Sequence, residues 1–273
     1  FPIFLIGTGH IQQYIASKQT NELSEALRWY DRLEKEFPNS PKIKDMLLKR
    51  IDVLRALSNN NEAIDLMQKI LSGGYRNVRL SQSEQTKLLK DLTQIYYSTG
   101  QLSAGLPYFG QLFEIARNPE DQALAAAASF EALFQAERLD DALNLLPRLA
   151  KESAVRYRPR LNVALLKASD KLVEVGRVND AALTLNLIKT TDIMIEWTEG
   201  EIESKAARVE QRTALGNSSS EFIERLQQEI NTLKANLEHL RKLPTLRNEL
   251  LVRRARNYTK TARRYEAFWM FYD

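Results

Sequence analysis

Apolar residues recur along most of the chain at the three- and four-residue spacing of amphipathic helices, in pairs of stretches separated by short polar breaks. The clearest pair spans residues 86–119. Its first stretch is interrupted at Ser98–Gly100, and its second runs from Ser103 to a closing Asn-Pro at Pro119. The pattern predicts two helices folded back on each other. Because one such hairpin cannot bury its apolar face alone, we expect neighbouring hairpins elsewhere in the chain.

A repeat of this hairpin is indicated by five small residues, each near the start of a predicted second helix, separated by 37, 42, 37 and 39 residues. Four positions after each small residue stands a bulky side chain, and seven positions after it another apolar one. A small residue followed by large ones lets two helices cross closely and still fills the space beside the crossing. The five sets are Ala26, Tyr30 and Leu33; Ala63, Met67 and Ile70; Gly105, Phe109 and Leu112; Ala142, Leu146 and Leu149; and Ala181, Leu185 and Ile188.

These positions resemble the tetratricopeptide repeat, whose pattern is W-x2-L-G-x2-Y, then A-x3-F, then P. The match is best in residues 86–119, where Tyr96, Gly105 and Phe109 stand in the motif's places, and next best in residues 165–188. The resemblance implies an all-α protein with a right-handed helical-repeat solenoid of about five helix-turn-helix units over residues 1–190.

Three departures from the repeat pattern affect the expected packing. The spacings exceed the consensus of about 34 residues, so we expect longer helices or loops. Ile51 and Phe130 stand where the first helix normally carries a small residue, so we expect these two hairpins to pack more openly or to be shifted by one residue. The first helix of the first unit, near His10–Ser17, is barely recognisable.

The pattern changes over residues 191–273. A stripe from Ile195 to Val209 predicts one helix, and Ser218 with Glu221 forms a possible capping box for the next. That next helix carries six apolar residues spaced 3, 4, 3, 4 and 3, from Ile223 to Leu240, which is the pattern of a coiled coil. The short turn favours a long antiparallel helical hairpin within the chain, with a dimer seam as the alternative.

The C-terminal stretch predicts a basic amphipathic helix. An apolar stripe runs from Leu251 to Trp269 and includes Ala262 and Tyr265, and the four cations on the opposite face are Arg253, Arg256, Lys260 and Arg263. Residues 241–264 hold nine Lys/Arg and one Glu, a net charge of +8. The other residues hold 30 basic and 34 acidic side chains, a net charge of −4. The basic tail therefore has four interpretations: a solvated helix face, docking onto an acidic groove, nucleic-acid binding, or contact with an anionic membrane surface.

The inventory of reactive residues argues against catalysis. The chain has no cysteine, and its two histidines, His10 and His239, are far apart in sequence. No zinc-protease, nucleophile-elbow, phosphate-loop or dinucleotide motif is present. The sequence therefore predicts a protein that is not an enzyme and has no catalytic residues, metal site or cofactor. It contains no stretch long enough to span a membrane.

Candidate binding residues follow from the repeat register, because the first helices of stacked hairpins line a concave groove. One motif position faces this groove once per repeat, and the two next inward positions add further side chains. An acidic stripe beside two aromatic rings would suit a partner that carries Lys or Arg and an apolar anchor. The alternative is that the rings pack between repeats and the acids are merely solvated. The groove candidates are Asp52, Arg55, Gln94, Tyr97, Glu131, Phe134, Asp170 and Glu174.

The sequence thus predicts a non-enzymatic scaffold that binds another protein through the groove, with possible self-association through residues 191–273. The ending of the first unit, residues 34–42, is weakly similar to repeats of bacterial cell-envelope proteins. This similarity favours a bacterial periplasm or envelope assembly over the cytoplasm. The alternative is a nucleic-acid or anionic-membrane-surface binder that uses the basic C-terminal helix.

Overall fold

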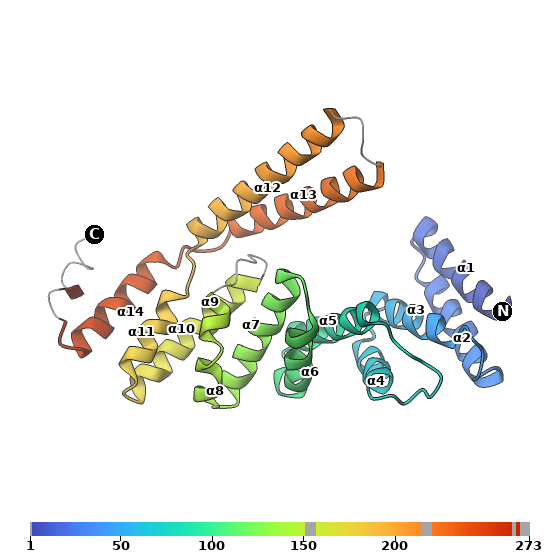
Figure 1. The fold of residues 1–273 in the computed structure, drawn as a ribbon, viewed down its shortest axis with the longest axis horizontal. Coiled ribbons are helices and arrows are strands. Elements are labelled where there is room, and N and C mark those ends of the chain that lie inside the picture. Colours follow the sequence, from blue (N-terminus) through green and yellow to red (C-terminus); the bar gives the residue numbers. More distant parts are fainter. Residues whose placement is uncertain (1, 151–156, 215–219, 264–265, 268–273) are drawn as a thin grey trace. The chain divides into compact units, whose positions relative to one another are not determined.

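The computed structural model describes residues 2–150, 157–214, 220–263 and 266–267. All regular secondary structure in these residues is helical (Figure 1), which confirms the predicted all-α class. The chain forms two compact units, Phe1–Ala116 and Arg117–Asp273. This division by compactness differs from the division by repeat pattern near residue 191, because the second unit contains both repeat hairpins and the long C-terminal hairpin.

The first unit consists of three helical hairpins. Consecutive helices pack against each other throughout, so that each hairpin also contacts the next one. The helices are α1 (Pro2–Ser17), α2 (Asn21–Glu36), α3 (Ile43–Ala56), α4 (Asn60–Leu71), α5 (Gln82–Thr99) and α6 (Leu102–Ile115).

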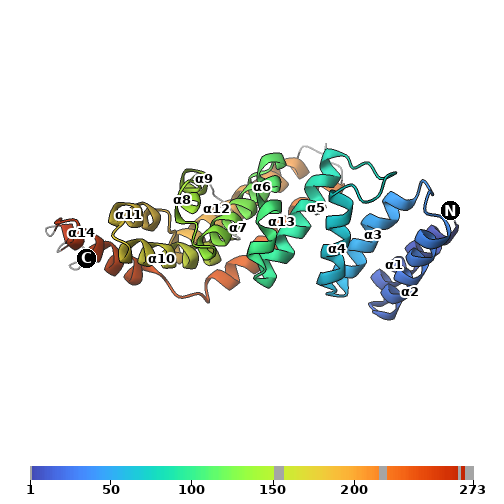
Figure 2. The same cartoon turned by 90° about the horizontal axis from the view of Figure 1, so that it is seen from below.

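The second unit continues the hairpin pattern and then departs from it. α7 and α10 are first helices that pack on each other, and the second helix after α7 is divided into two short helices at Asn144 and Leu145. The last helix, α14, packs against α11 (Figure 2). The helices are α7 (Pro119–Gln135), α8 (Leu139–Leu143), α9 (Leu146–Ala150), α10 (Arg158–Glu174), α11 (Val178–Asn186), α12 (Thr191–Ala214), α13 (Ser220–Leu240) and α14 (Arg247–Lys260).

The repeat register is confirmed by burial. All fifteen residues that define the five sets of small, bulky and apolar positions are buried. The best-matched hairpin shows why the small residue is needed, since a Cβ atom on Gly105 would lie 2.2 Å from the Phe109 ring and 2.8 Å from the Tyr96 Cβ. Both aromatic residues are buried and have no room to retreat. The close crossing of α5 and α6 therefore depends on the missing side chain.

One or two residues after the end of each first helix stands a residue in the left-handed conformation, with φ between 56° and 80°, and the second helix starts two or three residues after it. This conformation reverses the chain within one turn and closes the helix with backbone hydrogen bonds. Glycine adopts it without strain, which explains the breaks seen in the sequence, but three of the five turns use other residues. The five residues are Lys18, Ser58, Gly100, Glu137 and Gly176.

The first hairpin is better formed than the sequence indicated. α1 begins at Pro2, eight residues before the stretch in which the sequence pattern is barely recognisable. Its contact residue is Gly7, where a Cβ would lie 2.6 Å from the Tyr30 ring, and Phe4 stacks on the same ring with centroids 6.4 Å apart. The weak sequence match near His10–Ser17 arose because the small residue stands one to two turns earlier in this helix.

The two hairpins with bulky residues in their first helices differ from the others. Ile51 and Phe130 are both 1% exposed, so they fill the interior instead of facing solvent. The expected, more open packing of α3 with α4 and of α7 with α8 stays a prediction.

The long hairpin of α12 and α13 is antiparallel and internal to the chain (Figure 1), as predicted. Lys205 pairs with Glu229 at 2.8 Å and Glu199 with Arg241 at 3.0 Å, so residue numbers rise along one helix as they fall along the other. Four of the six predicted seam residues are buried, namely Leu226, Ile230, Leu237 and Leu240. The predicted cap at Ser218 lies outside the described residues.

The C-terminal helix is shorter than predicted. α14 ends at Lys260, and Ala262 adopts a left-handed φ of 61°. The Arg263 amide donates to the Tyr258 carbonyl at 2.8 Å, which closes the last turn with the hydrogen-bond pattern of a helix end. The expectation that one apolar stripe continues through Ala262 was therefore wrong, since this residue is exposed. Tyr265 and Trp269 lie outside the described residues.

One helix start in the first unit depends on a charged cap. The Ser81 hydroxyl accepts from the Glu84 amide, and the Glu84 carboxylate accepts from the Ser81 amide at 2.7 Å, which forms a capping box. Lys44 of α3 pairs with the same carboxylate at 2.9 Å. The hydrogen bond from Lys44 and those from Ser81 lower the pKa of Glu84 to about 2. The charged carboxylate thus connects the start of α5 with the preceding hairpin.

Replacing Gly105 by alanine is expected to destabilise the protein by about 1–3 kcal/mol, because the new methyl group overlaps Phe109 and Tyr96. Gly110 is the matched control on the same helix, since a Cβ there meets no atom within 4 Å. Gly110→Ala is expected to stabilise the protein by up to about 1 kcal/mol through higher helix propensity. Urea denaturation of both variants measures these changes, and a loss of stability for Gly110→Ala equal to that for Gly105→Ala would contradict the close crossing.

Glu84→Gln is expected to lower the free energy of unfolding by about 1 kcal/mol at pH 7, since it removes the charge from the cap and from the Lys44 pair. Because the folded-state pKa is lowered, this stabilisation is present above the unfolded pKa of 4.5 and is lost as the pH falls towards 2. Denaturation curves of parent and variant should therefore converge between pH 4.5 and pH 2. The exposed Glu114, changed to Gln, serves as control, and a gap that persists at pH 2 would refute the assignment.

Candidate functional site

A row of polar side chains joins the first helices of two successive hairpins in the first unit. Asp52 and Arg55 lie one turn apart on α3, and Lys87, Asp91 and Gln94 lie at successive turns of α5. The Lys87 ammonium is 2.9 Å from the Asp52 carboxylate. The Arg55 guanidinium is 2.6 Å from the Asp91 carboxylate and donates to the Gln94 side-chain oxygen at 3.3 Å. We call these five residues the α3–α5 polar row.

The two ion pairs of this row differ in their environment. Asp52 and Lys87 have side chains about half exposed, at 51% and 55%. The Asp91 side chain is 8% exposed, and one of its carboxylate oxygens has no hydrogen-bond partner. Burial raises the pKa of Asp91, and the positive charges of Arg55 and Lys87 oppose this rise. Arg55 is therefore required to hold the Asp91 charge, whereas the Asp52 pair remains available at the surface.

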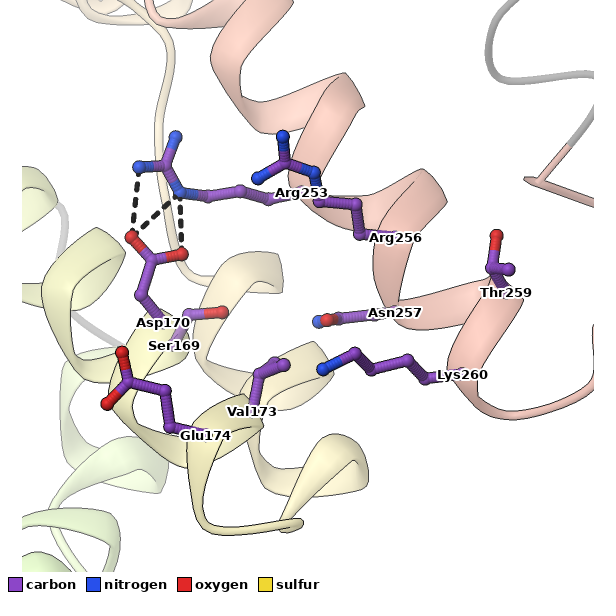
Figure 3. Close-up of a pocket in the computed structure, with 9 residues that line it drawn as sticks. All are labelled: Ser169, Asp170, Val173, Glu174, Arg253, Arg256, Asn257, Thr259 and Lys260. Atoms are coloured by element: carbon purple, nitrogen blue, oxygen red, sulfur yellow. Dashed lines mark hydrogen bonds and ion pairs between the residues drawn. The ribbon is translucent and has the colours of Figure 1, made fainter.

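The second unit repeats the same arrangement. Glu131 of α7 accepts two hydrogen bonds from Arg160 of α10, at 2.8 and 3.0 Å. Asp170 of α10 accepts from the Arg253 guanidinium of α14 through both carboxylate oxygens, at 3.0 to 3.2 Å (Figure 3). Such two-point contacts fix both position and orientation. In each unit, an acid at the groove position of one first helix thus pairs with a cation from a later helix.

The sequence predicted the groove acids but not the cations with which they pair. The predicted groove acids Asp52, Glu131 and Asp170 are each next to a cation, so their charge is largely balanced within the chain. Lys87 and Arg160 were not singled out from the sequence. In the sequence, each is a basic residue that stands seven to ten positions before the groove position of its own helix. This spacing predicts an ion pair only when the two first helices are known to be adjacent.

The remaining groove candidates are distributed between the core and the surface. Tyr97 is 6% exposed and lies in the core of the first unit. Phe134 is partly exposed, and Glu174 is exposed. The structure brings Arg55 and Gln94 together in the α3–α5 polar row and Glu174 near Asp170 in a pocket of the second unit. Whether these residues contact a partner stays a prediction.

The four cations of the basic tail are not equivalent. Arg253 pairs with Asp170, and Arg263 pairs with Glu266 at 2.9 Å and lies over the Tyr258 ring. Arg256 and Lys260 form no ion pair with any residue that the structure describes. Two of the four positive charges are thus balanced by a neighbouring carboxylate.

Arg256 and Lys260 line a pocket of about 560 Å³ between α10 and α14 (Figure 3). One wall carries the carboxylates of Asp170 and Glu174, and the other carries the cations of α14. Figure 3 shows Asn257 and Lys260 extending from α14 towards Ser169 and Val173 of α10. The full lining consists of Ser169, Asp170, Val173, Glu174, Arg253, Arg256, Asn257, Thr259 and Lys260.

Among the described residues, no group of three or more His, Cys, Asp or Glu side chains is placed to hold a metal ion. The described helices include none that combines the length and the apolar character needed to cross a bilayer. The α3–α5 polar row and the pocket present hydrogen-bonding groups and charges of both signs.

Comparisons with known proteins give structural neighbours only. No family model and no curated protein matches the sequence. YrrB, a tetratricopeptide protein with an unusual peptide-binding site, has a TM-score of 0.44 and 19% identity over 66% of this chain and 82% of its own. A tetratricopeptide repeat protein from Parabacteroides merdae has a TM-score of 0.45 and 14% identity, over 98% of this chain and 91% of its own. A Podosopora anserina protein with nearly identical TPR-like repeats has a TM-score of 0.37 and 14% identity, over 85% of this chain and 93% of its own.

Arg55→Met is expected to destabilise the protein by about 2 kcal/mol, because the buried Asp91 carboxylate loses its partner. Lys87→Met removes a cation from the same row but from an exposed pair, and is expected to cost less than about 1 kcal/mol. Urea denaturation distinguishes the two. Adding Asp91→Leu to Arg55→Met should recover much of the loss, since no unpaired charge then remains buried. Equal losses for the two single variants would contradict this account.

Proposed function

We propose that this protein is a non-enzymatic scaffold that holds a segment of another protein along the polar faces of its first helices. The observation that carries the proposal is the repeated acid–cation pairing between successive first helices, seen for Asp52 with Lys87 and for Glu131 with Arg160. These pairs place charged donors and acceptors on the first helices of each unit, over an interior already filled by the hairpin core. Side chains of both signs can bind the polar backbone and the charged side chains of an extended or helical peptide.

The α3–α5 polar row is the best-defined part of this surface. Its exposed members, Asp52 and Lys87, are anchored beside the buried pair of Arg55 and Asp91, so the row is held in place before a partner binds. Side chains ordered in advance lose less conformational entropy on association than free ones. Tyr97 is buried and therefore offers no ring to a partner in this unit, whereas Phe134 of the second unit is partly exposed.

An envelope setting is the finer part of the proposal. It rests on the weak similarity of residues 34–42 to repeats of bacterial cell-envelope proteins. We place the scaffold in an envelope assembly on these grounds. Fractionation of the native cells tests the setting, and recovery of the protein with the cytoplasmic fraction alone would refute it.

Partner contact is tested with a photo-crosslinking amino acid placed in the native cells at Gln94, in the polar row, or at Gln111, an exposed residue of α6. We expect a discrete crosslinked adduct from position 94 and none from position 111, because second helices lie outside the proposed surface. The partner identified in this way is then purified. Adducts from position 111 alone, or of equal yield from both positions, would contradict the proposed surface.

Affinity for the purified partner is measured by calorimetry with the triple variant Asp52→Lys, Glu131→Lys and Asp170→Lys. Each change sets two cations against each other, so we expect at least a tenfold loss of affinity, about 1.4 kcal/mol. Circular dichroism verifies that the fold is kept. The control variant replaces Glu62 and Glu114, two exposed glutamates on second helices, with lysine. Unchanged affinity in the triple variant would overturn the proposal.

A further inference from the structure

The hairpin of α12 and α13 has no neighbouring hairpin that covers its apolar residues. Its two helices pack mainly on each other and lie side by side (Figure 1). A helical hairpin cannot bury its whole apolar face alone, which is the reason that repeat hairpins stack. After Thr198, α12 contains no buried residue up to its end at Ala214. More than half of this helix therefore keeps its apolar side chains at the surface.

Three partly exposed apolar side chains form a line along α12, which we call the apolar stripe. Ile195, Ile202 and Val209 stand seven residues apart. Seven residues are about 20° short of two full helical turns, so the three side chains share one face. Ile223 and Leu233 of α13, two of the predicted seam residues, are also only partly buried. The seam between the two helices is thus open to a further helix, since this spacing is the one at which helices pack over several turns.

The residue after each member of the apolar stripe is a glutamate. Glu196, Glu203 and Glu210 are exposed, and none of them forms an ion pair with a residue that the structure describes. By contrast, Glu229 of α13 pairs with Lys205 at 2.8 Å. We call the three unpaired glutamates the acidic stripe. An apolar residue next to a free negative charge therefore recurs every seven residues, over about 21 Å of helix.

The charge of this face decides between a second copy of the chain and a different partner. Two copies that met through the apolar stripe would bring two acidic stripes to one interface, because an isologous contact uses the same surface twice. Like charges beside a coiled-coil seam oppose pairing, and opposite charges favour it. A helix with apolar residues at heptad spacing and Lys or Arg beside them complements both stripes.

We propose that the α12–α13 hairpin binds a basic amphipathic helix of another protein, which lies along the apolar stripe and completes a three-helix coiled coil. Burial of the partly exposed side chains supplies the apolar contribution to binding. Lys or Arg residues of the bound helix pair with the acidic stripe and set the choice of partner. This surface lies outside the repeat hairpins, so the assignment holds or fails independently of the α3–α5 polar row.

The test uses the full chain and three synthetic peptides of about four heptads each. The first carries Leu at the apolar heptad positions and Lys at the positions that flank them. The second has Glu in place of every Lys, and the third has the composition of the first in an order without a heptad. Fluorescence anisotropy measures the affinity of each labelled peptide, and circular dichroism measures its gain of helix on binding.

Three variants are compared with the parent chain. The first replaces all three glutamates of the acidic stripe with lysine. The matched control makes the same change of net charge outside this hairpin, at the exposed residues Glu62, Glu114 and Glu137. Ile202→Ser removes the central side chain of the apolar stripe. Thermal denaturation of each variant separates a loss of binding from a loss of fold.

We expect the lysine peptide to bind the parent and the control at least about tenfold more tightly than either other peptide, and to gain helix on binding. The stripe variant should prefer the glutamate peptide by a similar factor, because the charges of the two partners are then exchanged. Ile202→Ser should weaken binding several-fold. Absence of binding by the lysine peptide, equal affinity for the peptide without a heptad, or a parental preference in the stripe variant would overturn the proposal.

Discussion

The close crossing of two helices within a hairpin is the constraint on which the rest of the structure depends. At Gly105 the space for a side chain is already occupied by Phe109 and Tyr96, and at Gly7 it is occupied by Tyr30. A hairpin closed in this way buries one face of each helix and leaves the other faces to contact the neighbouring hairpins or solvent. The left-handed residues that end the first helices, such as Gly100 and Gly176, allow this closure within a two- to three-residue turn.

Because the apolar residues pack at these crossings, the first helices contact neighbouring first helices partly through polar side chains. The pairs of Asp52 with Lys87 and of Glu131 with Arg160 follow from that geometry, because the groove position of one first helix lies next to the early turns of the following one. The exposed pair of Asp52 and Lys87 contributes little to stability. The occurrence of such a pair in each unit is the basis of the proposed role in recognition.

The sequence predicted the hairpins better than it predicted the polar contacts. The fixed spacing of small and large residues predicted burial correctly at all fifteen positions of the five sets, because a helix crossing recurs in every hairpin. Ion pairs between helices were not visible, since Arg253 and Asp170 are 83 residues apart in the chain. The end of α14 was missed because Ala262 carries no local signal for a left-handed conformation, unlike a glycine.

Burial also decided between interpretations that the residue types had left open. Tyr97 occurs at a register position that faces the groove, yet it is 6% exposed. Asn257 gave no signal in the sequence, because an asparagine in a polar helix is ordinary. Its burial at the lining of the α10–α14 pocket, beside two cations that form no ion pair with any described residue, became visible only in the structure.

The central claim is that a partner protein binds the polar faces of the first helices and not the second helices. Hydrogen exchange of the full chain, measured by mass spectrometry with and without the purified partner, tests it most directly, because backbone amides at a contact are protected. The account predicts slower exchange in α3 and α5 on binding, with α4 and α6 unchanged. Protection concentrated in α4 and α6, or no change in α3 and α5, would contradict it.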